Sequence, residues 1–205
     1  MAWQKRKKIL LANQFSLLLF CIMLASVVWQ TSLVSIDQQV NSHMDALRSD
    51  ALVPVVKLIT DVNGFAGAGL FSFLVTGVFL WKKWFTETRF FLLSTLGATG
   101  LFALVKAVVE RSRPLSSVLE VSGYSFPSGH TTMATAMAFA LYFILKEKTV
   151  SGMVQFGLFA AAFGWALLIG WSRLYLDVHW FTDVVGGFGL GLFWVTLLKL
   201  LSKPA

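Results

Sequence analysis

Six apolar runs constrain the fold of this chain more than any other feature of its sequence. Most approach the ~20 residues that a helix needs to cross a bilayer, and the fourth is short enough to need its flanking residues. Because a backbone within lipid must satisfy its own hydrogen bonds, helices are the form we expect. The runs are residues 9–29, 64–81, 90–109, 131–145, 153–171 and 181–201. The sequence therefore predicts an all-α integral membrane bundle of six transmembrane helices.

Composition supports the membrane class. Hydrophobic residues make up 57% of the 205 residues and charged residues 13%, and the mean hydropathy is +0.73. The length is that of one domain, so we expect residues 1–205 to form a single membrane-embedded unit. The formal net charge is +7, but the basic residues occur in short clusters between apolar runs. No soluble face remains for nucleic acid, which argues against a nucleic-acid-binding protein.

The positions of Lys and Arg predict the orientation. Six spans place both termini on one side, and eleven of the 17 Lys and Arg residues fall there. They are residues 5–8, Lys82, Lys83, Arg89, Lys146, Lys148, Lys199 and Lys203. The positive-inside rule makes this side cytoplasmic. The basic N-terminus lacks a cleavage site after its apolar run, so we expect a retained signal anchor.

The segment between the first two runs, residues 31–60, predicts an amphipathic helix at the outer interface. Its apolar residues recur at helical spacing: Ile36, Val40, Met44, Leu47, Ala51, Val55 and Ile59. Pro54 would bend or interrupt this helix. His43 falls on the polar side, which favours a solvated surface histidine over a site residue.

Lys106 and Arg113, at the end of the third run, are the first polar residues of interest. They are seven residues apart, which is two helical turns, so both could point the same way and bind a phosphate or carboxylate. An interfacial basic cluster, with Lys106 paired to Glu110, is the alternative. Arg111 lies off this face, and we assign it no role.

A second segment, Tyr124 to His130, directly precedes the fourth run. Ser128 is a candidate helix cap, and a helix start offers free N–H groups to an anion. Gly129 would let the backbone approach a ligand closely. His130 would then stand beside a bound phosphate, although a plain capped helix would have the same sequence.

The third segment, residues 171–187, carries Arg173, His179 and Asp183 between two apolar runs. His179 and Asp183 are four residues apart, so a helix would place the carboxylate beside one ring nitrogen and leave the other free to react. Asp177 falls outside this pairing, and we interpret it as a solvated loop acid. Two histidines and a carboxylate could instead bind zinc. Three cations in the same pocket would repel a metal ion, so we expect none.

Together the three segments resemble the signature of the type 2 phosphatidic acid phosphatase superfamily. The matching motifs are Lys106-x6-Arg113-Pro114, Pro127-Ser128-Gly129-His130 and Ser172-Arg173-x5-His179-x3-Asp183. The superfamily includes phosphatidylglycerophosphatases, undecaprenyl-diphosphate phosphatases, lipid A phosphatases and soluble vanadium-dependent haloperoxidases. The resemblance implies a lipid phosphatase, working without a metal or cofactor at the extracytoplasmic face of a bacterial cytoplasmic membrane.

The resemblance also implies a role for each site residue. His179 would be the nucleophile that forms a phosphohistidine, and Asp183 would orient its ring. His130 would act as general acid and then as general base. The phosphate oxygens would be held by Lys106, Arg113, Ser128, Gly129 and Arg173.

Several functions remain open. The substrate could be phosphatidylglycerophosphate, phosphatidic acid or undecaprenyl diphosphate, and a lipid A phosphatase or phosphotransferase would use the same residues. A transporter of phosphorylated lipids would need the cations but gives no reason for a paired histidine and carboxylate opposite a second histidine. A haloperoxidase is disfavoured because that branch is soluble. The sequence gives no indication of an oligomeric state.

Overall fold

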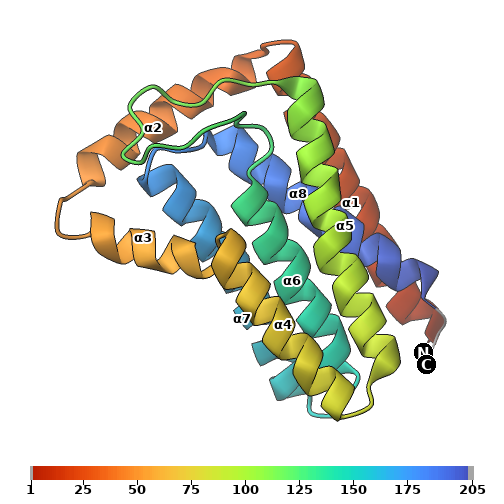
Figure 1. Cartoon of the computed structure of the whole chain (residues 1–205). Coiled ribbons are helices and arrows are strands. Elements are labelled where there is room, and N and C mark those ends of the chain that lie inside the picture. Colours follow the sequence, from red (N-terminus) through yellow and green to blue (C-terminus); the bar gives the residue numbers. More distant parts are fainter. Residues whose placement is uncertain (1, 203–205) are drawn as a thin grey trace.

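In a computed structural model, residues 2–202 are described, and they form helices without strands (Figure 1). The α-helices are Ala2–Val28 (α1), Ser35–Leu47 (α2), Val53–Val62 (α3), Phe65–Trp81 (α4), Phe85–Val109 (α5), Gly129–Lys146 (α6), Gly152–Tyr175 (α7) and Phe181–Leu201 (α8). A 3-10 turn, Ser32–Val34 (η1), precedes α2. Each predicted apolar run corresponds to one helix, so the all-α prediction is confirmed.

Four described helices are long and apolar enough to cross a membrane: Arg6–Val28 within α1, α5, α7 and α8. α3 and α4 would make a fifth span if they are taken as one, although they meet at a bend of 42°. α6 does not reach the same apolarity. The chain is thus a multi-pass membrane protein, while the count of six spans stays a prediction.

α6 lies in the interior of the bundle, where it packs against α5, α7 and α8 (Figure 1). Thr132 and Thr135 are buried there, and their hydroxyls donate to the carbonyls of Ser128 and Thr131, at 2.8 and 2.7 Å. Threonine is tolerated on this helix because its hydroxyl is satisfied by its own backbone. A helix surrounded by protein needs less lipid-facing hydrophobic surface, which explains the low apolarity of α6.

α1 and α8 lie side by side and antiparallel, so the first residues of α1 lie near the end of α8 (Figure 1). The Asn13 amide of α1 donates to the carbonyl of Phe193 at 2.9 Å and to the hydroxyl of Thr196 at 3.0 Å. Lys199 lies at this same end, opposite the polar segments; Lys203 falls outside the described residues.

The segment predicted as one outer amphipathic helix is two helices. α2 ends at Leu47, and α3 begins at Val53 with Pro54 in its first turn, where a proline is tolerated. α2 lies across the upper end of the bundle in Figure 1. Its buried residues are Asp37 and Asn41, whereas Leu47 is exposed. α2 thus turns a polar stripe toward the protein.

Close approach of α8 to α6 yields a stability prediction. A Cβ atom on Gly191 of α8 would lie 2.5 Å from the carbonyl oxygen of Thr132 in α6, so backbone would have to move. We expect Gly191→Ala to lower the free energy of unfolding by about 1–3 kcal/mol, as overpacked cores do. The thermal unfolding midpoint in detergent, followed by circular dichroism, measures this.

Gly157→Ala on α7 is the matched control, because no atom lies within 4 Å of a Cβ built there. It should leave the midpoint unchanged or raise it, since alanine favours a helix more than glycine does. Equal thermal unfolding midpoints for the two variants would contradict the close packing of α6 on α8.

Candidate active site

Three segments distant in the sequence meet at the upper end of the bundle. The loop after α5, residues 110–128, passes beside the turn between α7 and α8, residues 176–180 (Figure 1). The backbone N–H of Ser125 donates to the carbonyl of Arg111 at 2.8 Å, and that of Ser128 donates to the carbonyl of Asp183 at 3.0 Å. The start of α6 is thereby joined to the first turn of α8.

His179 and Asp183 form a buried pair. The Nδ1 atom of His179 lies 3.3 Å from Oδ2 of Asp183, and both side chains are almost fully buried. The same carboxylate oxygen accepts the backbone N–H of Trp180 at 2.9 Å, which ties it to the start of α8. The predicted pairing is confirmed in position, although α8 begins only at Phe181, so His179 lies in the turn before the helix.

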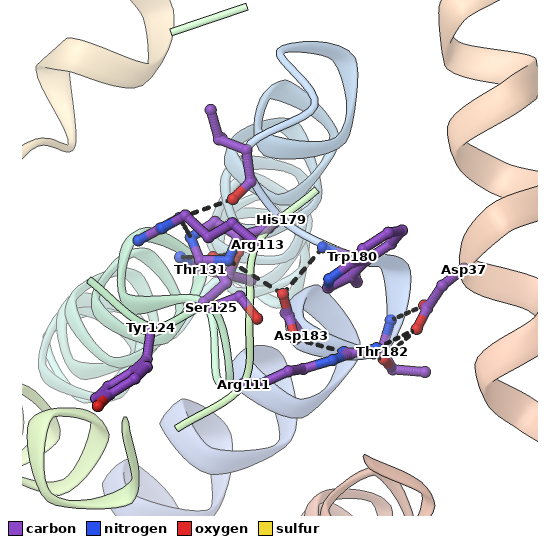
Figure 2. A network of polar contacts seen from close by, with 12 residues as sticks. Asp37, Arg111, Arg113, Tyr124, Ser125, Thr131, His179, Trp180, Thr182 and Asp183 are labelled. Carbon is purple, nitrogen blue, oxygen red and sulfur yellow. Dashed lines mark hydrogen bonds and ion pairs between the residues drawn. The ribbon is translucent and has the colours of Figure 1, made fainter. Parts of the chain in front are cut away.

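The other ring nitrogen of His179 faces a cation. Nη1 of Arg113 lies 3.3 Å from Nε2 (Figure 2). A guanidinium can only donate and an ionised carboxylate can only accept, so this arrangement assigns the proton to Nδ1 and the lone pair to Nε2. An imidazole in this tautomer presents a nucleophilic nitrogen toward the cations.

The surroundings keep the His179 ring neutral. Burial lowers the pKa of His179 well below its ordinary value, because an imidazolium would lose its hydration. The positive charges of Arg173, Lys106 and Arg113 lower this pKa further. A neutral ring keeps its lone pair at neutral pH.

Backbone carbonyls hold two of the three predicted cations. Nζ of Lys106 donates to the carbonyl of Tyr124 at 2.6 Å. Arg113 donates from Nε to the carbonyl of Gly123 at 2.9 Å and from Nη1 to that of Val178 at 2.7 Å. These contacts fix the cations in place without neutralising them.

Arg173 is the most buried of the three cations. It is 4% exposed, its Nη1 donates to the hydroxyl of Thr60 at 2.8 Å, and its buried Nε has no partner among the described residues. Lys106, Arg113 and Arg173 have no carboxylate within 4.0 Å in the described part of the chain. The alternative pairing of Lys106 with Glu110 is therefore not formed. An uncompensated buried charge is costly, which marks this cluster as a place for an anion.

The prediction that Lys106 and Arg113 lie on one face of a helix was wrong, although both side chains reach the site. α5 ends at Val109, and Glu110 adopts a left-handed conformation with φ 52°. Arg113 therefore lies in a loop, and its helical phase relative to Lys106 has no meaning. Arg111 was assigned no role for the same reason, because it lies off that assumed helical face.

Ser128 caps α6, as predicted. Its hydroxyl oxygen accepts from the backbone N–H of Thr131 at 3.4 Å and from the Thr131 hydroxyl at 2.9 Å. Gly129 begins the helix, and a Cβ atom there would lie 3.0 Å from the Phe102 ring. The start of α6 is thus closely packed on one side.

His130 brings a second imidazole to the cluster. Its ring is half-buried in the first turn of α6, which the Ser128 N–H joins to the carbonyl of Asp183. Its backbone carbonyl accepts from the Asn63 side chain at 2.9 Å, which anchors this turn to the junction of α3 and α4. The described structure therefore gathers all eight predicted site residues at one end of the bundle; their roles stay predictions.

Sequence reasoning missed a buried ion-pair network behind His179. Nη1 of Arg111 lies 2.6 Å from Oδ1 of Asp183, and its Nη2 lies 2.6 Å from Oδ2 of Asp37 on α2 (Figure 2). Asp37 also accepts from the backbone N–H and hydroxyl of Thr182, each at 2.8 Å. Arg111 was visible as a charge in the first motif, but nothing in the sequence pairs it with Asp37.

Asp177 is not a solvated acid. It is fully buried and accepts from the Asn41 amide at 2.6 Å and from the Ser116 hydroxyl. Burial raises the pKa of Asp177, while the Ser116 hydrogen bond lowers it. The turn before His179 is thereby tethered both to α2 and to the loop after α5.

The donor set of this site suits an anion rather than a metal ion. Among residues 2–202, no group of three or more His, Cys, Asp or Glu side chains is placed to hold a metal. The group that faces His179 Nε2 is the Arg113 guanidinium, whose positive charge would repel a metal ion.

Comparisons with known proteins identify the family. The model of the PAP2 superfamily matches residues 64–204. Phosphatidylglycerophosphatase B of Bacillus subtilis is 32% identical over 190 residues, which cover 90% of this chain and 92% of that protein. An undecaprenyl-diphosphatase of Sulfolobus acidocaldarius is 32% identical over 78 residues, 38% of this chain and 32% of that protein.

A solved structure agrees with these matches. The crystal structure of a transmembrane PAP2-type phosphatidylglycerolphosphate phosphatase from Bacillus subtilis superimposes with a TM-score of 0.81 at 30% identity, covering 91% of this chain and 94% of that one. The family match, the full-length relative and the shared fold agree with the geometry of the site. The chain therefore belongs to the PAP2 superfamily and is a membrane-bound phosphatase.

Proposed function

We propose that this protein hydrolyses the phosphate or diphosphate headgroup of a membrane lipid, using His179 as nucleophile. One observation carries the proposal: the buried imidazole of His179 is kept neutral, and the Arg113 guanidinium, which has no carboxylate partner in the described part of the chain, lies 3.3 Å from its Nε2 atom. A phosphate bound by these cations would lie next to Nε2, and the positive charge would favour attack on the otherwise repellent anion. No separate domain is needed, so residues 1–205 would act as one unit.

The first half-reaction transfers the phosphoryl group to the enzyme. Nε2 of His179 forms a bond to phosphorus while the bond to the lipid oxygen breaks. His130 would be protonated once the negative charge of the bound phosphate offsets the surrounding cations, and it would then give its proton to that oxygen as general acid. Asp183 accepts the Nδ1 hydrogen bond and stabilises the positive ring of the resulting phosphohistidine, as an orienting acid does in other catalytic pairs.

The second half-reaction releases phosphate. Water attacks phosphorus and gives a proton to His130, which now acts as general base. The bond between phosphorus and Nε2 breaks, and its electron pair returns to the ring. Inorganic phosphate leaves, and both histidines recover their starting states.

The cationic groups would bind the non-bridging oxygens throughout both steps. Lys106, Arg113 and Arg173 supply charge, and the Ser128 hydroxyl and Gly129 amide would add hydrogen bonds at the start of α6. These groups would supply the charge neutralisation that magnesium provides in kinases, so we propose a mechanism without a metal.

An apolar cavity next to the site supports a lipid substrate. It has a volume of about 320 Å³ and lies between α6, α7 and α8. Thr131, the neighbour of His130, is on its wall, together with Trp171, Phe181 and Phe188. Such a lining suits a hydrocarbon chain. The near full-length similarity to phosphatidylglycerophosphatase B makes phosphatidylglycerophosphate our first candidate, with phosphatidic acid, undecaprenyl diphosphate and lipid A as alternatives.

We propose that the site opens on the extracytoplasmic side of a bacterial cytoplasmic membrane. The basic residues Lys82, Lys83, Lys146 and Lys199 lie at or beside the helix ends opposite the site. The positive-inside rule makes that end cytoplasmic, with both termini. A lipid of the outer leaflet could then present its headgroup to His179 while its chains stay in the bilayer.

The nucleophile can be tested with purified protein in detergent and the lipid phosphates named above. We expect His179→Ala to lower kcat by at least about a thousandfold on each accepted lipid, because the covalent step is lost. Phosphate release measures the rate. A transporter would instead keep lipid binding and transport in this variant.

His43→Ala is the matched control, since this histidine on α2 is exposed and its ring hydrogen-bonds the carbonyl of Gln39 in its own helix. It should keep full activity. Undiminished turnover by His179→Ala would contradict the proposed nucleophile.

The absence of a metal requirement is a separate prediction. Phosphate release should persist in excess EDTA and should not rise when Mg²⁺ is added, because Lys106, Arg113 and Arg173 already supply the positive charge. Activity that disappears in EDTA and returns with Mg²⁺ would overturn this part of the mechanism.

The pH dependence follows from the state of His179. As the pH falls through its pKa, the ring gains a proton and Nε2 loses its lone pair, so activity is lost on the acid side. Because burial lowers this pKa, the acid limb of kcat/KM should lie below about pH 6.5, the ordinary value for histidine. The measurement needs the ionisation of the substrate phosphate titrated separately. An acid limb of the enzyme above that pH would contradict a buried neutral nucleophile.

A further inference from the structure

The carboxylate of Asp37 lies behind the catalytic pair, although it belongs to a helix more than 140 positions away from it in the sequence. Asp37 is 1% exposed and accepts hydrogen bonds from Arg111 and twice from Thr182. Arg111 in turn donates to Oδ1 of Asp183, whose Oδ2 faces His179. Figure 2 shows this sequence of contacts from α2 to the start of α8.

The charges in this network balance only when His179 becomes positive. Arg111 carries one positive charge, and Asp37 and Asp183 carry two negative charges when ionised. Without Asp37, Arg111 would neutralise Asp183 and leave no net negative charge facing Nδ1. With Asp37, one net negative charge remains on the side of the ring opposite Arg113. That charge favours the positive ring formed when Nε2 bonds to phosphorus.

We propose that Asp37 is a positioning residue for the phosphatase reaction: by pairing with Arg111 and Thr182, it orients Asp183 and preserves the negative field that stabilises the phosphorylated His179. The inference rests on the proposed role of His179 as nucleophile. α2 is then part of the catalytic framework rather than only a helix at the membrane interface.

A second contact from the same face of α2 supports this role. Asn41 lies one helical turn after Asp37, is also buried, and donates to Asp177 at 2.6 Å. Asp177 has a left-handed backbone, with φ 52°, in the turn that leads to His179. α2 therefore holds the turn before His179 through Asn41 and the helix after it through Asp37.

The test compares Asp37→Asn with Asp45→Asn. The first change keeps the size of the side chain and removes its charge. The second removes the same charge from the same helix, at an exposed residue that is paired with Arg48. Each variant is assayed for kcat and for inhibition by vanadate and by inorganic phosphate. Vanadate can bond to Nε2 in a five-coordinate form that resembles the transition state, whereas phosphate reports ground-state binding.

We expect Asp37→Asn to lower kcat about tenfold and to raise the ratio of the vanadate Ki to the phosphate Ki by a similar factor, the size of effect seen when outer partners of site residues are removed. Asp45→Asn should change neither value. A Ki does not depend on the fraction of active protein, so misfolding alone would lower kcat and leave the ratio unchanged. That unchanged ratio would overturn the proposal.

Two further variants keep the test decisive. Combined with Arg111→Gln, Asp37→Asn should have a much smaller effect than alone, because coupled residues are not additive; full additivity would contradict action through Arg111. If Asp37→Asn does not fold, Thr182→Val, which removes the hydroxyl between Asp37 and Arg111, should raise the ratio in the same direction. Activity that survives His179→Ala would instead refute the nucleophile itself, which is a different result.

Discussion

The uncompensated positive charge around His179 is the constraint on which this end of the molecule depends. Charges removed from water need partners, and carboxylates are their usual partners. Here Lys106, Arg113 and Arg173 are held mainly by carbonyls and a hydroxyl, which satisfy their hydrogen bonds but leave their charge. Lys106 belongs to α5, Arg113 to the loop that follows it and Arg173 to α7, so these elements must be fixed rigidly to keep the cations together. A bound phosphate would complete the charge balance.

A fourth cation, unlike these three, is paired with carboxylates, and this difference polarises the imidazole. Arg111 is paired with two carboxylates, Asp37 and Asp183, and lies on the Nδ1 side of His179. The unpaired Arg113 lies on the Nε2 side. The ring therefore has net negative charge on its Nδ1 side and positive charge on its Nε2 side. This arrangement keeps the free ring neutral, yet it is suited to stabilise a ring that becomes positive when Nε2 is phosphorylated.

Local patterns predicted the helices and the residues that gather at the site, but not the contacts between distant segments. The spacing of His179 and Asp183 is short enough for one turn and one helix to fix, so the sequence predicts their pairing. Asp37 and Arg111 are 74 positions apart, and only the folded chain brings them together. Asp177 was misread for the same reason, since its burial depends on Asn41 and Ser116. The apolarity of α6 does not mark it as a span, because surrounding helices replace the hydrophobic surface that lipid would demand.

α2 shows how one periodic pattern can have two meanings. Its apolar residues recur at helical spacing, which predicts a helix at the membrane interface, and Ile36 and Leu47 are indeed exposed. The same period places Asp37 and Asn41 together on an adjacent face, where both are buried against the protein. An amphipathic helix at an interface has no need to bury a carboxylate. The burial of Asp37 is reasonable only because Arg111 and Thr182 satisfy it, and those residues are in turn fixed by Asp183 and the start of α8. Catalytic geometry and interfacial helix thus depend on one another through a single buried charge network.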